Sequence, residues 1–439
     1  MNNIKPSNEE NVEFAFGEVP QHKRKNLFSL ILVLAGYPIA LSNFVIGGTV
    51  GVGLKFTDAI LALTIGNLVL ISIVILTGIA AYKTGLSTSL LSKRAFGKSG
   101  SYIFSSLLAL SAITWVALNG DIFSRLVIQT FDWWPLSVPL TAIVAILLWL
   151  QSAVRGYKGL EIISGVGVPA ALILSFYGVY KVGQSSGGFE GVLSYIPASP
   201  IAFSTATAAI VGGWIFGATI TPDVCRYANK KSHVFIAGII AFILGCFGLQ
   251  FAGVLIAIST GQGDFALAMA SLGLVLVAFF ASVFCLWTTQ DNNIYGASLA
   301  IQNIIQDTKY KGKIKHKHIA VAIASIAAIL AAGGIYSNIL PIITFLSVLI
   351  PPVPGIIIAQ EFFVKKQQAE LMVNQKAMIS WLVGSVLGYI SLQAGFFIPA
   401  VIGVVSAGLC YILINTLTGQ QNSQNVETKT EQDAKTIPY

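Results

Sequence analysis

Residues 27–53 read LFSLILVLAGYPIALSNFVIGGTVGVG, an apolar stretch that is interrupted by Gly36-Tyr37-Pro38. The stretch can cross a bilayer, because a transmembrane helix needs roughly 20 predominantly apolar residues. Glycine and proline break such a helix only where the freed backbone faces protein or a watery cavity. A second apolar run, residues 201–227, carries similar interruptions at Gly212-Gly213-Trp214 and Gly217-Ala218-Thr219. We therefore expect two discontinuous transmembrane helices.

Apolar runs of this kind fill the chain. Of its 439 residues, 55% are hydrophobic and only 10% are charged, whereas soluble domains average about 25% charged residues. The composition excludes an ordinary soluble domain and predicts an all-α polytopic membrane protein. Twelve runs are long enough to be transmembrane helices: 27–53, 58–82, 101–130, 136–154, 159–182, 201–227, 233–259, 266–304, 318–336, 338–363, 376–394 and 396–416.

Lysine and arginine fall almost entirely in alternate loops between these runs, and positive residues mark cytoplasmic loops. On the side of the N-terminus the loops carry Lys83, Lys93, Arg94, Lys98, Arg155, Lys158, Arg226, Lys230, Lys231, Lys309, Lys311, Lys313, Lys315, Lys317, Lys365, Lys366 and Lys376. The opposite loops carry Lys55 and Lys181. The pattern predicts a plasma-membrane protein with both termini in the cytoplasm. It also accounts for the formal net charge of +8 without a nucleic-acid partner.

The two interrupted runs lie five runs apart, which is typical of an inverted repeat with a binding site near the middle of the membrane. We expect a transporter domain over 26–417, with repeats at about 27–182 and 201–363 and two extra helices in 376–416. Residues 1–25 are predicted to be a cytoplasmic tail. Residues 418–439 are too polar to fold alone, so we expect them to be disordered in the cytoplasm.

Polar residues inside the runs gather at residues 285–293, which read CLWTTQDNN. Helical spacing places Cys285, Thr288 or Thr289, and Asn292 on one stripe. A buried polar stripe must face a polar partner, an ion or water. Adjacent hydroxyls, together with carbonyls released from a broken helix, suit a hard alkali cation.

Two tryptophans predict a site for a planar heterocycle. Trp115 and Asn119 are one helical turn apart, so they offer a flat apolar ring beside an amide group. Trp214 lies in the interruption of the sixth run and offers a second ring. Stacking of a base on an aromatic ring contributes roughly 1–3 kcal/mol.

The chain resembles the nucleobase:cation symporter family 1, in particular its cytosine permease branch, over nearly all of residues 15–416. The resemblance is carried by GYPIALSNFVIGGTVGVG (36–53), Gly66-Asn67, KTGLS (83–87), RAFG (94–97), Trp115, TITPDVCRY (219–227) and WTTQDNNIY (287–295). It implies the leucine-transporter fold, a 5+5 inverted repeat plus two helices. It also implies import of a purine, a pyrimidine or a related ring such as a hydantoin, coupled to sodium or protons.

The resemblance further implies two sites. The ring would stack between Trp115 and Trp214, and its edge would be read by the backbone at Gly213 and Phe216 and by the side chains of Asn119 and Gln290. Sodium, as the coupling ion, would bind at Gly36, Ala40, Cys285, Thr288 and Thr289, and no cofactor is expected. Three positions depart from the cytosine permease pattern: Cys285 and Gln290 replace asparagines, and Phe216 replaces a serine. We therefore expect the class, cytosine or a related pyrimidine, purine or hydantoin-type ring, rather than cytosine in particular.

Three alternatives stay open. Asp121 or Asp291 could carry a proton in place of sodium, although we interpret Asp121 and Arg125 as a structural pair. A membrane-embedded enzyme would be expected to show acidic motifs for magnesium, and the sequence has no Asp-x-x-Asp motif. A channel would be expected to show a short repeated filter, which is not visible either. We expect a monomeric transporter rather than an enzyme.

Overall fold

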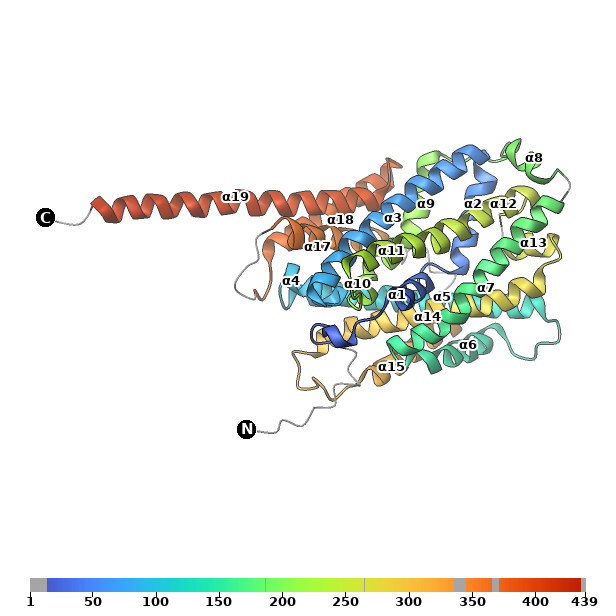
Figure 1. Cartoon of the computed structure of the whole chain (residues 1–439), viewed down its shortest axis with the longest axis horizontal. Helices are drawn as coiled ribbons and strands as arrows, with labels where there is room; N and C mark the ends of the chain where they lie inside the picture. The colour runs from blue at the N-terminus through green and yellow to red at the C-terminus, as the bar shows by residue number, and fades with distance from the viewer. Residues whose placement is uncertain (1–13, 186, 264, 335–344, 365–370, 436–439) are drawn as a thin grey trace.

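The computed structural model describes residues 14–185, 187–263, 265–334, 345–364 and 371–435. Figure 1 shows these residues as a bundle of helices, from which the end of the last helix projects. The first half contains α1 (Leu27–Gly36), α2 (Leu41–Gly53), α3 (Phe56–Thr84), α4 (Thr88–Phe96), α5 (Gly100–Thr130), α6 (Val138–Ala153) and α7 (Tyr157–Gln184). A short helix, α8 (Gly188–Leu193), leads to the second half.

The second half repeats this order of spans. It contains α9 (Phe203–Ile220), α10 (Pro222–Cys225), α11 (Lys231–Phe242), the π-helix η3 (Ile243–Gly248), α12 (Leu249–Thr260), α13 (Phe265–Ser271), α14 (Val275–Ile305), α15 (His316–Ala332) and α17 (Pro352–Phe362). The two extra helices are α18 (Gln375–Ala394) and α19 (Pro399–Lys435).

The described helices match the predicted spans. Eight are long and apolar enough to cross a membrane, and the bent pair of α1 and α2 makes nine. The other three are the shorter apolar helices α6 and α15, and α14, whose middle contains the polar block of residues 288–293. Residues 335–344, which include the start of the tenth predicted run, lie outside the described residues.

The first span is discontinuous, as predicted. Helices α1 and α2 meet at an angle of 60°. The amide of Asn43 donates to the carbonyl of Pro38 in the bend and accepts from Gln250 Nε2 of α12 at 2.8 Å. Asn67 of α3 donates to Gln250 Oε1 at 2.7 Å. All three amides are buried, so this chain of hydrogen bonds fixes the bend to α3 and α12.

The sixth span is not bent as the first one is. Helix α9 runs without a break through Gly212-Gly213-Trp214 and Gly217-Ala218-Thr219, and only Thr221, whose backbone angles stay helical, separates it from α10. Together α9 and α10 form one apolar span, Phe203–Cys225. The physical reason is that glycine can keep its helical hydrogen bonds, at a cost of about 1 kcal/mol. Pro222 has no N–H to donate, so the helical pattern is interrupted beside it.

The structure describes part of each predicted tail. Ala15 and Val19 are buried, and the amide of Lys25 donates to Tyr227 O at 2.7 Å, so the described part of residues 1–25 packs on the bundle. Helix α19 continues to Lys435 and extends beyond the bundle (Figure 1), and disorder of 418–439 stays a prediction. This segment is polar, but it is rich in helix formers such as Gln, Glu and Lys.

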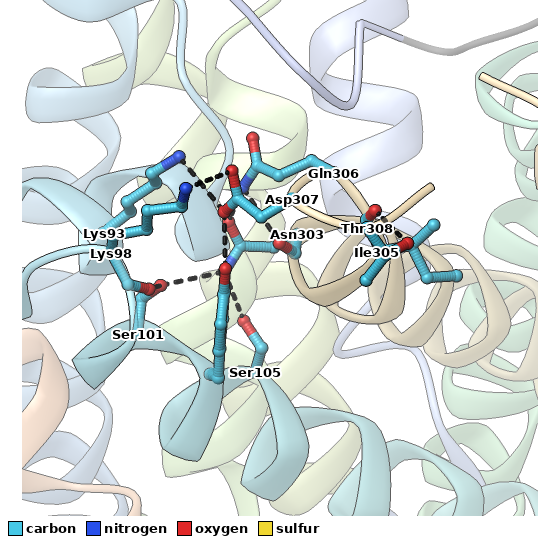
Figure 2. A network of polar contacts seen from close by, with 10 residues as sticks. Lys93, Lys98, Ser101, Ser105, Asn303, Ile305, Gln306, Asp307 and Thr308 are labelled. Atoms are coloured by element: carbon cyan, nitrogen blue, oxygen red, sulfur yellow. Dashed lines mark hydrogen bonds and ion pairs between the residues drawn. The ribbon is translucent and has the colours of Figure 1, made fainter. Parts of the chain in front are cut away.

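Figure 2 shows a polar network at the C-terminal end of α14. The same helix carries the Thr288-Thr289 pair in its middle. Asn303 Nδ2 donates to Ser101 and Ser105 of α5 at 3.1 and 2.9 Å. Asp307 pairs with Lys98 at 3.0 Å and with Lys93 of α4 at 3.8 Å. Partial burial raises the pKa of Asp307, but the hydrogen bonds from Tyr102 and Lys98 and the nearby lysine charges outweigh it and hold that pKa below its usual value. The network therefore ties α14 to α4 and α5.

We predict that Asn43→Ala destabilises the protein. The change leaves the Pro38 carbonyl and a donor of Gln250 without a partner, at about 1–3 kcal/mol for each buried group. The melting temperature in detergent, measured against Thr64→Ala, tests this. Thr64 is a matched control because its hydroxyl bonds to Ile60 O of its own helix on the exposed face. Equal melting temperatures for the two variants would contradict the prediction.

Candidate functional site

A cavity of about 400 Å³ lies beside the bend in the first span. Four helical spans line it: the first span, at its bend and α2, and the spans of α5, α9 and α14. The lining residues are Tyr37, Ser42, Trp115, Asn119, Gly213, Trp214, Phe216, Gly217, Thr289 and Asn293.

The structure brings together five of the six residues predicted for the ring: Trp115, Asn119, Gly213, Trp214 and Phe216. Both tryptophans and the Asn119 amide line the cavity, so an apolar surface and a polar group are available to the same ligand. A second cavity of about 340 Å³ lies on the other side of Trp115 and Phe216, against residues 346–350.

Gln290 is not among the residues that line the cavity. Its Nε2 donates to the carbonyl of Val116 at 2.9 Å, and its Oε1 faces Asn293 Nδ2 at 3.5 Å. The reason is helical geometry, because Gln290 follows Thr289 by one residue and is rotated by about 100° from it. Asn293, four residues after Thr289, shares the face of Thr289 and provides the amide at the cavity wall.

Sequence reasoning missed Tyr37, Ser42, Gly217 and Asn293. Tyr37 and Ser42 belong to the interrupted stretch, and Asn293 belongs to the polar block. The sequence therefore indicated both segments, but it did not indicate which of their residues line the cavity. Gly217 follows Gly213 by one helical turn. A Cβ atom at Gly217 would lie 2.6 Å from the Trp214 ring, so the glycine lets the indole lie against α9.

The predicted cation ligands lie where α14 meets the bend and α7. Thr289 Oγ1 lies 3.3 Å from the carbonyl of Ile39 and donates to Cys285 O at 2.9 Å. Thr288 Oγ1 lies 2.8 Å from Ser164 Oγ of α7. A Cβ atom at Gly36 would lie 2.5 Å from Thr288 Oγ1. The structure thus brings Gly36, Thr288 and Thr289 together.

Ala40 differs from its predicted placement. Its carbonyl accepts from the backbone N–H of Asn43 at 3.0 Å. The carbonyl that meets α14 is that of Ile39. Cys285 is buried and its thiol is free, so the oxygen that it brings to this region is its carbonyl. The donors here are neutral hydroxyl and carbonyl oxygens, a set that fits a hard monovalent cation.

The two acidic candidates for proton transfer have different surroundings. Asp121 Oδ2 accepts from Arg125 Nε at 2.8 Å, as expected for a structural pair. Asp291 is fully buried, and the polar group that faces its carboxylate is the hydroxyl of Ser152, which itself accepts from Trp287 Nε1 at 2.7 Å.

Arg226 closes the end of the bundle that carries residues 14–25. Its guanidinium is buried and donates to Tyr295 OH and to the carbonyl of Phe14, both at 2.9 Å. Asp223 Oδ1 accepts from the amide of Thr88 at 2.7 Å, which joins α10 to α4.

Solved transporters share this fold. Mhp1, a nucleobase-cation-symport-1 family transporter solved in a closed conformation with bromovinylhydantoin bound, is 17% identical, with a TM-score of 0.78 over 93% of this chain and 96% of Mhp1. A Na⁺-coupled sialic acid symporter is 12% identical, with a TM-score of 0.69 over 93% of each chain. The fold is therefore that of a secondary transporter with two five-helix repeats.

The sequence comparisons give the family. The family model for permeases of cytosine/purines, uracil, thiamine and allantoin matches residues 18–419. The cytosine permease of Escherichia coli K12 is 29% identical over 413 residues, which cover 93% of this chain and 96% of that protein. The chain belongs to this family of permeases and is a multi-pass membrane transporter, not an enzyme.

Proposed function

We propose that the protein imports a planar nucleobase-like ring by sodium symport with alternating access. The observation that carries the proposal is the cavity beside the bend of the first span, whose walls include Trp115 and Trp214. Cytosine, other pyrimidines, purines and hydantoin-type rings fit this chemistry. The cytosine permease and the hydantoin-bound Mhp1 among the similar proteins support the same class.

The ring would stack on the two indoles, with its polar edge toward Asn119 and Asn293. Gln290 would act indirectly, by positioning Asn293. Its amide donates to the carbonyl of Val116 of α5 and faces the amide of Asn293. The backbone at Gly213 and Phe216 completes the wall. A cavity of this kind selects rings whose donors and acceptors match its own buried polar groups, since an unmatched group is left unpaired.

Sodium would bind between the bend and α14. The residues that would hold it are Gly36 and Ile39 through the backbone, Thr288 and Thr289 through their hydroxyls, and Cys285 through its carbonyl. The ion would supply a positive charge that holds α14 to the bend. This arrangement resembles the use of backbone carbonyls released from discontinuous helices in transporters.

The orientation follows from the lysine and arginine pattern. We propose that the face that carries residues 14–25 and Arg226 is cytoplasmic, that both termini lie in the cytoplasm, and that a single chain is the functional unit in the plasma membrane. At that face Arg226 joins Tyr295 of α14 to the segment at Phe14.

A proton is the alternative coupling ion. The observation in its favour is Asp291, a fully buried carboxyl group that faces the hydroxyl of Ser152 and forms no ion pair among the described residues. An intramembrane acid of this kind is often part of a proton pathway. The two alternatives differ in one measurement, the dependence of uptake on sodium at constant pH.

The proposal is tested by a thermal-shift screen of the purified protein against cytosine, uracil, hypoxanthine, allantoin and hydantoins, in sodium or in potassium. We expect one class of ring to raise the melting temperature, and to do so more strongly in sodium. Uptake of that ring into proteoliposomes should saturate and should accumulate the ring against its gradient. A flux that neither saturates nor accumulates would indicate a channel instead.

We predict that Trp115→Ala and Trp214→Ala each weaken ring binding by about 1–3 kcal/mol, the range for loss of one stacking partner. Expression should persist, because both rings face a cavity rather than a packed helix contact. Isothermal titration of the purified variants with the ring found in the screen gives the affinities. If both variants bind as tightly as the parent, the ring does not stack between these tryptophans.

We predict that Thr288→Ala and Thr289→Ala raise the sodium concentration needed for half-maximal uptake, because each removes a hydroxyl beside the bend. Initial rates measured against sodium, with choline as the replacement ion, provide the test. Unchanged sodium curves in both variants would contradict the sodium site. Sodium-independent uptake by the parent would favour the proton.

We predict that the double variant Phe216→Ser and Gln290→Asn shifts preference toward cytosine. The serine adds a hydroxyl at the cavity wall, and the shorter amide frees Val116 and moves Asn293. Adding Cys285→Asn should raise sodium affinity, because it provides a side-chain oxygen. Competition of labelled-ring uptake by unlabelled cytosine, uracil, hypoxanthine, allantoin and hydantoins measures the shift. A parent that already prefers cytosine by a wide margin would show that these positions do not determine specificity.

A further inference from the structure

Ser164 of α7 presents a hydroxyl to the region proposed for sodium. The residue is fully buried, and its Oγ lies 2.8 Å from Thr288 Oγ1. Serines inside helices commonly bond back to their own helix, as Ser175 does on the same helix through Ala171 O at 2.8 Å. The hydrogen bond at Ser164 instead crosses to α14.

Two glycines make this meeting of three helices possible. A Cβ atom at Gly36 would collide with Ser164 Oγ and would lie 2.5 Å from Thr288 Oγ1. A Cβ atom at Gly167, one turn after Ser164, would lie 2.8 Å from the carbonyl of Phe284 and 3.1 Å from Thr288 Cγ2. The bend, α7 and α14 therefore converge on the two hydroxyls without intervening side chains.

A hard cation prefers oxygen donors, and a thiol is a soft ligand. At residue 285 this chain has a buried cysteine, whose side chain brings sulfur rather than oxygen to the proposed site. The hydroxyl of Ser164 provides a neutral oxygen next to that of Thr288. These two hydroxyls bond to each other in the described structure, and each has a second lone pair with which to accept a cation.

We infer that Ser164 is a further sodium ligand, which extends the site from the bend and α14 to α7. The inference rests on the proposed sodium symport. It makes α7 part of the ion site, so that bound sodium holds three helices rather than two.

The test is sodium-dependent thermal stabilisation of the purified full-length protein, with potassium keeping the ionic strength constant and no ring present. In Ser164→Ala, the sodium concentration for half-maximal stabilisation should rise about tenfold, the change expected for loss of one hydrogen-bond-sized interaction. Ser164→Cys, which conserves the shape but replaces oxygen by sulfur, should show the same loss. Ser175→Ala is the matched control on α7 and should keep the parent value.

The outcomes separate this inference from the proposed function. A parent that sodium does not stabilise more than potassium would overturn the sodium site as a whole and Ser164 with it. A parent that sodium stabilises, with unchanged sodium curves for both Ser164 variants, would overturn the Ser164 assignment alone. A lower melting temperature in potassium, without a change in the sodium midpoint, would likewise show a purely structural residue.

A second comparison distinguishes a ligand from a residue that only orients Thr288. If Ser164 contacts the ion itself, Ser164→Ala should raise the sodium midpoint again when it is added to Thr288→Ala. If Ser164 acts only through Thr288, the double variant should match Thr288→Ala, and this result would overturn the assignment.

Discussion

The bend between α1 and α2 is the constraint on which the rest of the structure depends. Within a bilayer, a backbone group freed from a helix costs several kcal/mol unless protein or water satisfies it. Asn43 satisfies the carbonyl of Pro38, and Thr289 faces the carbonyl of Ile39. Because Asn43 is held in turn by Gln250 and Asn67, the need to satisfy two carbonyls determines how α3, α12 and α14 are placed around the cavity.

Close helix packing follows from the same bend. Apolar burial provides little driving force between helices in lipid, so association depends on small residues and polar contacts. A Cβ atom at Gly253 of α12 would lie 2.5 Å from the carbonyl of Phe44, and one at Gly51 of α2 would lie 2.9 Å from Val254 Cα. The glycine-rich sequence of α2 therefore serves its contact with α12, while Gly36 serves the contact of α1 with α7 and α14.

The spans and the first bend could be predicted from sequence, because long apolar runs and a Gly-Tyr-Pro interruption report directly on the cost of placing a polar backbone in lipid. Which neighbour faces the site could not. One residue rotates a helical side chain by about 100°, and this rotation decides that Asn293 rather than Gln290 lines the cavity. The choice of the Ile39 carbonyl over that of Ala40 depends on the geometry of the bend. The short break at Thr221 comes directly before Pro222. In the sequence this single proline is a less conspicuous helix breaker than the glycine pair at 212–213, through which α9 in fact continues.

Thr289 gives the proposed coupling a physical basis. Its side chain lines the cavity, and its hydroxyl meets the carbonyl of Ile39 at the bend. A ring in the cavity and a cation at the bend would therefore both act on the contact between α14 and the first span. A ligand shifts a conformational equilibrium only by its difference in affinity for the two states, and this contact must change if the bend moves during alternating access. Each ligand would then favour the state that the other needs, and the coupling between their affinities would be reciprocal.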